Sequence, residues 1–317
     1  MGAYAVFGFY ILSGYLMTLI MQRTYGYSAT GLKKYAANRF LRIYPTYWVS
    51  VLITVMLLIG FGQEAILDFK NAMYWPATWF EWVRNIFIFF PDRQLPILTP
   101  PSWALTVELF FYLLIGLGLS RSSKACLLWF SLSLLYHVVA VVFDFGWPNR
   151  YYTVFAASLP FSIGACIYHF KDVITTRVNS VVKVSFYSVM LVFCVAFGIN
   201  WLLGYATGMS RSLFFYTNLT ICTITVCMLA SVKLESPKLN KLDSVFGDYS
   251  YPIYLIHYQV AALVFFFVNS TDAGIQLSRP SIWLLVLSLI PILFSAWLIV
   301  KLVDHPINRL RNQVRKR

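Results

Sequence analysis

Nine long apolar stretches constrain the fold of this chain more than any other feature of its sequence. A helix needs about 20 mainly apolar residues to cross the hydrocarbon core of a bilayer. The chain has 317 residues, of which 59% are hydrophobic and only 12% are charged, whereas about a quarter of a soluble domain is charged. The sequence therefore predicts a single all-α membrane domain over residues 1–317, with about nine spanning helices. We place them at about residues 3–22, 45–62, 103–120, 124–144, 152–170, 183–203, 212–232, 250–269 and 282–303.

The basic residues predict which helix ends face the cytoplasm. With the N-terminus outside, the segments on the inner side hold 19 of the 25 Lys and Arg residues, and those on the outer side hold six. Cytoplasmic loops are enriched in Lys and Arg, so this count supports the orientation and places Arg39 and Arg42 in the cytoplasm. We attribute the formal net charge of +13 to topology and to anionic lipid headgroups, and predict no nucleic-acid partner.

Two segments outside the predicted spans have their own character. Residues 63–101 form a long outer loop, and within it the apolar piece at residues 79–90 is too short to span and is interrupted by Glu81 and Arg84. We expect this piece to lie at the interface or to re-enter the membrane. Residues 304–317 are predicted to be a solvated, basic cytoplasmic tail. The cysteines indicate neither a disulfide framework nor a metal site, because all five lie in apolar segments and none forms a C-x-x-C pair.

Arg39 and Arg42 lie three residues apart, so on a helix they share one face. Pro45 follows them, and proline suits the first turn of a helix, which predicts that a new helix begins there. The pair has two interpretations. It marks a cytoplasmic loop, or it binds a phosphorylated donor, because the rigid guanidinium fork matches phosphate. From the arginines alone, we favour the topological interpretation.

Ionisable residues inside membrane helices are functional candidates, and Glu108 and His257 are the two strongest here. Glu108 is predicted about 8 Å below the outer boundary and His257 about 10 Å above the inner one, so we expect them to flank a central cavity rather than form a dyad. A buried structural role and a functional role are equally favoured for Glu108, and helix packing is favoured for His257. The predicted helix that contains His137 has no charged residue near it, which indicates that His137 packs between helices.

Five short motifs occur in order along the chain: FYILSGYL at residues 9–16, RFLRIYP at 39–45, SWALTVELFFY at 102–112, SYPIYLIH at 250–257 and VDHP at 303–306. Together they resemble the integral-membrane acyltransferase 3 family, which includes O-acetyltransferases of lipopolysaccharide O-antigen and of exopolysaccharide. The resemblance implies a ten-helix bundle in the bacterial inner membrane. Such a bundle moves an acyl group from cytoplasmic acyl-CoA, usually acetyl-CoA, to a hydroxyl of a glycan or lipid-linked glycan, with no bound cofactor.

The same resemblance assigns roles to particular residues. Glu108 and His257 are implied as catalytic candidates. The implied donor site comprises Arg39, Arg42, Tyr44 and Tyr47, and the implied acceptor or cavity-lining residues are Ser102, Trp103, Tyr112, Ser250 and Tyr254. The family's first helix carries an arginine and, about ten residues later, a catalytic histidine, and no residue here matches either. We therefore expect the sequence to be truncated or the chain to be inactive alone. The alternative function is a catalytically degenerate protein that passes or flips a glycan or acyl group.

Overall fold

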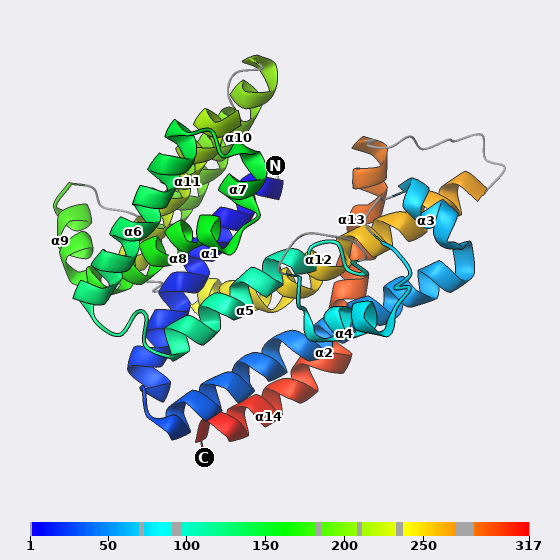
Figure 1. The fold of residues 1–317 in the computed structure, drawn as a ribbon, viewed down its shortest axis with the longest axis horizontal. Coiled ribbons are helices and arrows are strands. Elements are labelled where there is room, and N and C mark those ends of the chain that lie inside the picture. Colours follow the sequence, from blue (N-terminus) through cyan, green and yellow to red (C-terminus); the bar gives the residue numbers. More distant parts are fainter. Residues whose placement is uncertain are drawn as a thin grey trace. The chain divides into compact units, whose positions relative to one another are not determined.

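A computed structural model describes residues 2–69, 73–90, 97–181, 185–207, 211–232, 237–270 and 282–316 (Figure 1). Every regular element in these ranges is helical, which confirms the all-α prediction. Two short π-helical segments, at Met21–Tyr25 and Val300–Asp304, accompany the α-helices. The α-helices are α1 (Gly2–Ile20), α2 (Ala29–Phe61), α3 (Gln63–Phe69), α4 (Trp79–Phe87), α5 (Ser102–Gly116), α6 (Ser123–Val142), α7 (Gly146–Tyr151), α8 (Val154–His169), α9 (Lys171–Val181), α10 (Phe186–Thr207), α11 (Arg211–Ser231), α12 (Pro237–Ser270), α13 (Ile282–Ile299) and α14 (His305–Lys316).

Eight helices in the described ranges are long and apolar enough to cross a membrane, and each overlaps one of the predicted stretches. The remaining stretch, residues 103–120, is the shorter apolar helix α5, which has 15 residues and a length of about 22 Å. It ends early because residues 117–120 turn, with Gly118 at φ +109°, a conformation that favours glycine. The basic residues Lys70, Arg93, Lys183, Lys233, Arg279 and Arg317, which enter the count of loop charges, lie outside the described residues.

Helix α2 corrects the prediction that a new helix begins at Pro45. It runs unbroken for 33 residues with Pro45 inside it, a length of about 50 Å. Proline removes a backbone hydrogen bond within a helix, but membrane helices tolerate it where neighbouring groups satisfy the backbone. The carbonyl that loses its helical partner is that of Leu41, four residues before Pro45; nearby, the Tyr251 hydroxyl of α12 donates to the Ile43 carbonyl at 2.9 Å. Arg39 and Arg42 therefore lie on the N-terminal part of one long helix.

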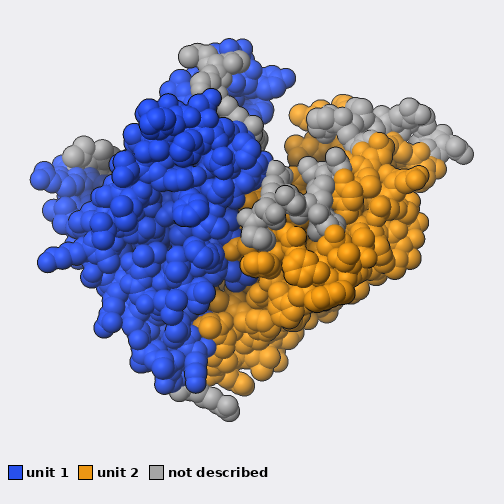
Figure 2. Space-filling view, viewed as in Figure 1, with its two compact units in different colours: residues 1–35, 107–235 blue, residues 36–106, 236–317 orange. Residues whose placement is uncertain are grey.

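The chain divides into two compact units (Figure 2). Unit 1 comprises residues 1–35 and 107–235, and there α8 packs against α1, α6 and α11. A Cβ atom on Gly14 of α1 would lie 2.2 Å from the Phe161 carbonyl oxygen, and one on Gly164 of α8 would lie 2.0 Å from the Ile11 carbonyl oxygen. Only glycine fits at either position. These two glycines therefore allow the backbones of α1 and α8 to approach closely.

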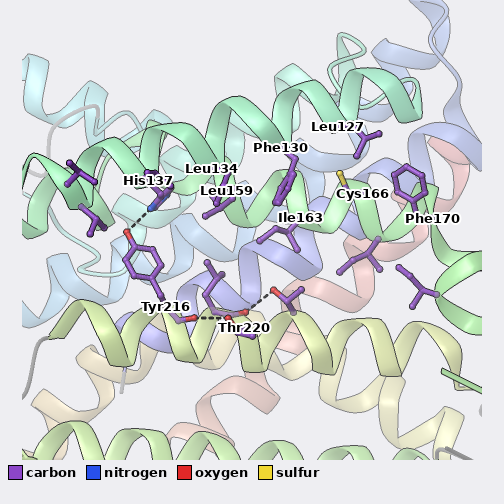
Figure 3. A pocket seen from close by; sticks show the side chains of 17 residues that line it. Leu127, Phe130, Leu134, His137, Leu159, Ile163, Cys166, Phe170, Tyr216 and Thr220 are labelled. Atoms are coloured by element: carbon purple, nitrogen blue, oxygen red, sulfur yellow. Dashed lines mark hydrogen bonds between the residues drawn. The ribbon is translucent and has the colours of Figure 1, made fainter. Parts of the chain in front are cut away.

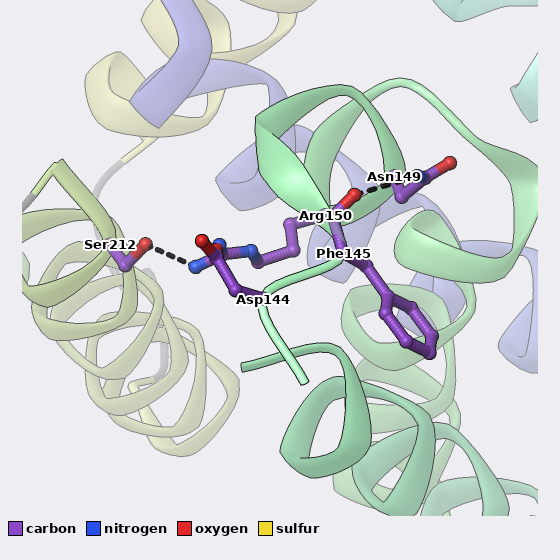
Figure 4. Close-up of polar contacts among 5 residues, drawn as sticks. All are labelled: Asp144, Phe145, Asn149, Arg150 and Ser212. Carbon is purple, nitrogen blue, oxygen red and sulfur yellow. Dashed lines mark hydrogen bonds and ion pairs between the residues drawn. The ribbon is translucent and has the colours of Figure 1, made fainter. Parts of the chain in front are cut away.

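An arginine joins α7 to the start of α11 within unit 1 (Figure 4). The Arg150 guanidinium pairs with the Asp144 carboxylate and donates to Ser212 Oγ at 2.7 Å. Arg150 is itself buried, whereas the Asp144 side chain is 83% exposed. The ion pair therefore lies at the rim of the unit and holds the α6–α7 turn against α11.

Unit 2 comprises residues 36–106 and 236–317, and in it α12 packs against α13. Three side chains of α2 hold the C-terminal end of the short helix α4. Tyr47 donates to the carbonyl of residue 85, Trp48 to that of residue 86 and Tyr44 to that of residue 87. Glu81, which interrupts the apolar run of this segment, has a local structural role, because it completes a capping box with Thr78 that begins the helix. The interfacial or re-entrant placement of the segment stays a prediction. The predicted tail is mostly the helix α14.

Candidate functional site

Three arginines of unit 2 gather on α2 and α14, and we call them the guanidinium cluster: Arg39, Arg42 and Arg311. All three are half-buried. The side-chain oxygen of Asn38 accepts from Arg39 at 3.0 Å and from Arg311 at 3.4 Å, so one neutral atom is shared by two guanidiniums. Arg42 donates to the Gly247 carbonyl of α12 at 3.2 Å. The fold thus brings a third arginine, from the predicted tail, to the pair that the sequence singled out.

The composition of this cluster favours an anionic ligand. Three guanidiniums gather at one place on α2 and α14, and their contacts include a side-chain amide and a backbone carbonyl. Guanidinium groups bind phosphate oxygens in a bidentate manner and remain charged at all physiological pH values. A group of three half-buried arginines is therefore suited to bind a phosphorylated compound.

A buried carboxylate lies close to the cluster. Asp304 is in the π-helical segment before α14, and its Oδ1 accepts from Thr46 of α2 at 2.6 Å. The charges of Arg42 and Arg311 act on it. Asp304 belongs to the closing motif at residues 303–306 but was not selected as a site residue, because no local pattern indicates that it is buried. It tempers the positive potential of the cluster and fixes the junction of α13 and α14 to α2.

The two tyrosines implied as donor-binding residues have structural partners instead. The Tyr47 hydroxyl donates to the Asn85 carbonyl at 2.6 Å and the Tyr44 hydroxyl to the Phe87 carbonyl at 3.0 Å. Both hydroxyls are thereby directed to α4 rather than to the guanidiniums. Their proposed part in donor binding stays a prediction, and the contacts give them a role in holding α4.

Glu108 lies at the centre of a buried polar cluster in unit 1. Its Oε1 accepts from Ser13 Oγ of α1 at 2.7 Å and from the hydroxyl of Tyr112, one turn further along α5. The Tyr35 hydroxyl donates to the Tyr112 backbone carbonyl at 3.2 Å. Tyr112 follows Glu108 by four residues, a spacing that places two side chains on one face of a helix. The contribution of Ser13 has no such local signal, because Ser13 lies 95 residues away in the sequence.

His257 of α12 is half-buried in unit 2, and its Nδ1 lies 2.8 Å from the Tyr254 carbonyl oxygen. A carbonyl can only accept, so Nδ1 carries the hydrogen and the lone pair of the neutral ring is on Nε2. That is a tautomer in which a ring nitrogen can take a proton. Glu108 and His257 belong to different units, so their predicted placement about a central cavity stays a prediction.

The remaining predicted residues are placed as follows. The Tyr254 hydroxyl donates to the Pro101 carbonyl at 2.9 Å, and the exposed Ser250 donates to the Gly247 carbonyl of its own helix at 3.1 Å. The two side chains are thus not directed at a common point. Ser102 and Trp103, in the first turn of α5, are both buried.

A neutral polar network between α2 and α12 was missed by sequence reasoning. The Gln259 amide oxygen accepts from Ser50 Oγ at 2.9 Å and from Thr54 Oγ1 at 3.1 Å, and its nitrogen donates to the Leu255 carbonyl at 3.0 Å. Ser50 and Thr99 hydroxyls are 3.1 Å apart. All four side chains are fully buried. Gln259 lies two residues after His257, but its amide is uncharged and therefore gives no signal of an ionisable residue within an apolar helix.

These features define a multi-pass, all-α membrane protein with a cationic cluster and buried acids. Residues 1–301 match the family model described as an acyltransferase domain, so the chain belongs to the acyltransferase 3 family. This confirms the family resemblance. No solved structure matches the chain.

Two curated relatives are similar to nearly the whole chain. YrhL of Bacillus subtilis (strain 168), provisionally named a peptidoglycan O-acetyltransferase, is 25% identical over an alignment that covers 94% of this chain and 49% of YrhL. Peptidoglycan O-acetyltransferase OatA of Listeria monocytogenes (serovar 1/2a, strain EGD-e) is 24% identical, with 95% of this chain and 50% of OatA covered. The chain therefore spans about half the length of the curated relatives it matches.

Proposed function

We propose that this chain forms the membrane part of an O-acetyltransferase in the bacterial plasma membrane. It takes an acetyl group from cytoplasmic acetyl-CoA and transfers it to a hydroxyl of a cell-surface glycan. The guanidinium cluster is the observation that carries the donor assignment, because acetyl-CoA is bound chiefly through its phosphates. Both curated relatives are named for peptidoglycan, so peptidoglycan is the first acceptor to test, followed by lipopolysaccharide glycans and lipid-linked glycans.

The transfer needs a base for the attacking hydroxyl. The hydroxyl oxygen attacks the thioester carbonyl carbon, a C–O bond forms and the C–S bond breaks. The hydroxyl proton passes to the base and then to the departing thiolate, which leaves as free CoA. We assign the base to His257, since its Nδ1 contact leaves the lone pair on Nε2. Glu108 acts as a positioning residue that orients Ser13 and Tyr112.

Binding of acetyl-CoA to the purified chain tests the donor site. We expect Arg39→Gln and Arg42→Gln each to weaken binding at least about tenfold, because a hydrogen bond to a charged group contributes about 1.5–3 kcal/mol. Lys33→Gln is the matched control, since Lys33 is an exposed cation at the start of the same helix. Arg42→Lys keeps the charge but loses the fork, so it should be intermediate.

The measurement is isothermal titration calorimetry in detergent at two salt concentrations. If both glutamine variants bind acetyl-CoA like the parent and like Lys33→Gln, the arginines only mark topology and the donor assignment is wrong. The transfer itself is measured as base-labile acetate on peptidoglycan from cells that express the chain. Acetate that does not rise above the level in cells without the chain would contradict the proposed transfer to peptidoglycan, whatever the result of the binding measurement.

A further inference from the structure

An apolar groove of about 670 Å³ runs along unit 1 between α6, α8 and α11, and α9 lies at one end (Figure 3). Its walls include Phe130 and Leu134 of α6, Leu159 and Ile163 of α8, and Leu219 of α11. These helices are among those long and apolar enough to span the membrane. The medium around the groove is therefore hydrocarbon, and its natural occupant is a lipid chain.

A polar pair divides the groove along its length. On α6 the groove extends from Leu127 to Val142, which is 15 residues or about 22 Å. Ten residues from Leu127, His137 Nδ1 lies 2.9 Å from the Tyr216 hydroxyl (Figure 3), and His137 Nε2 donates to the Ala156 carbonyl at 2.8 Å. The apolar wall between Leu127 and this pair is about 15 Å long, which is half of a hydrocarbon core of about 30 Å.

The helix ends at the opposite end of the groove are held together by local contacts. Cys166 Sγ donates to the Cys126 carbonyl at 3.5 Å, and His169 Nε2 donates to the Ser120 carbonyl at 2.9 Å. The start of α6 therefore lies beside the end of α8, where α9 begins. This places the first residues of α6 and α9 around one mouth of the groove.

That mouth is basic. Lys124 precedes the groove residue Leu127 by three positions on α6, and on α9 Lys171 and Arg177 lie three positions either side of the groove residue Ile174. Residues three apart share a helix face, so each cation is next to a wall of the groove. Asp172 is the one acidic residue within α9. The loops that carry these cations are predicted to be cytoplasmic.

We propose that this groove binds one anionic phospholipid of the cytoplasmic leaflet. An acyl chain lies along α6 and α11 as far as the His137–Tyr216 pair, and the phosphate is bound by Lys124, Lys171 and Arg177. Charge complementarity selects an anionic headgroup over a zwitterionic one, and the long apolar wall between the mouth and the His137–Tyr216 pair selects a membrane lipid over a water-soluble phosphate. The residues of this site belong to unit 1, whereas the guanidinium cluster belongs to unit 2.

Native mass spectrometry of the purified full chain tests the proposal, with dioleoyl-phosphatidylglycerol and dioleoyl-phosphatidylcholine as probes. We expect the parent to retain one phosphatidylglycerol and to prefer it to phosphatidylcholine. Each cation near an anionic surface contributes about a factor of five, so replacing all three cations with Gln should weaken phosphatidylglycerol binding about a hundredfold. The charge-matched control replaces Arg23, Lys33 and Lys34 with Gln and should bind like the parent.

A second pair of variants tests the groove rather than the charges. Ile163→Trp fills the groove and should reduce the retention of both lipids at least tenfold. Ile199→Trp adds the same bulk on α10, where Ile199 is 52% exposed and lines no part of the groove, and should leave binding unchanged. Thermal unfolding in detergent checks each variant, and the single-cation variants replace the triple variant if it does not fold.

Several results would overturn the proposal. Equal retention of the two lipids by the parent would exclude recognition of an anionic headgroup. Unchanged phosphatidylglycerol binding in the triple variant or in Ile163→Trp would exclude this location. Displacement of the lipid by palmitoyl-CoA at equal concentration would assign the groove to an acyl-CoA, and a lipid-free dimer would assign it to a second copy of the chain.

Discussion

The Glu108 cluster allows a quantitative test of what a buried acid contributes to this membrane protein. Ser13 and Tyr112 donate to the same oxygen of Glu108, and all three side chains are buried. We consider Ser13→Ala, Tyr112→Phe and the double variant. The Tyr112→Phe change removes only the hydroxyl, because the contact from Tyr35 is to the backbone carbonyl of Tyr112.

The expected magnitudes follow from the charge of the acceptor. A hydrogen bond to a charged group contributes about 1.5–3 kcal/mol, so each single variant should lower the free energy of unfolding by about that amount. After one donor is lost, the other still stabilises the same oxygen. The double variant should therefore be less stable than the sum of the single changes predicts, by about 0.5–3 kcal/mol.

The assay is equilibrium unfolding in mixed micelles, titrated with SDS and followed by tryptophan fluorescence. The control repeats the Ser13→Ala change in a Glu108→Gln background, where the acceptor is neutral. There the expected loss falls to about 0.5–1.5 kcal/mol. Strict additivity of the two single changes, within about 0.5 kcal/mol, would show that the two hydroxyls do not share a charged acceptor and would refute this reasoning.

Three further changes have clear expected outcomes. Gly164→Ala should lower the free energy of unfolding by about 1–3 kcal/mol or more through overpacking. Gly198→Ala is the control and should not lower it, because a Cβ atom at that position has open space. Thermal unfolding in detergent compares the two variants. Tyr47→Phe should increase hydrogen exchange in α4 and lower stability by about 0.5–1.5 kcal/mol, and unchanged exchange would show that α4 is held otherwise. Asp304→Asn should tighten acetyl-CoA binding about fivefold, because removing a nearby negative charge strengthens phosphate attraction by about 1 kcal/mol; weaker binding by calorimetry would contradict the placement of the donor at the arginines.

Helix existence was predictable from the sequence because burial in lipid demands long apolar runs. The residues at which helices begin and end were harder to predict. Pro45 carries a local signal for a helix start, but the contact of Tyr251 with the backbone near it depends on α12, some two hundred residues away. At Gly118 the local conformation decides instead. A single residue with a positive φ ends α5 within a stretch whose composition still predicts a membrane span.

The candidate site shows the same division between local and distant information. Glu108 was found because a charge stands out in an apolar helix, and Tyr112 followed from its i,i+4 spacing. Ser13 and Arg311 were not linked to their partners, because contacts between segments far apart in the chain leave no local pattern. The hydroxyls of Tyr44 and Tyr47 show that membership in a motif does not tell whether a side chain contacts a ligand or another helix.

The guanidinium cluster of α2 and α14 has a consequence for regulation in the cell. If the cluster holds acetyl-CoA by its phosphates, it holds free CoA equally well, since transfer of the acetyl group leaves those phosphates unchanged. The spent carrier then competes with fresh donor for the same arginines. The rate of glycan acetylation would follow the ratio of acetyl-CoA to CoA in the cytoplasm rather than the amount of acetyl-CoA, which would couple modification of the cell surface to the metabolic state of the cell.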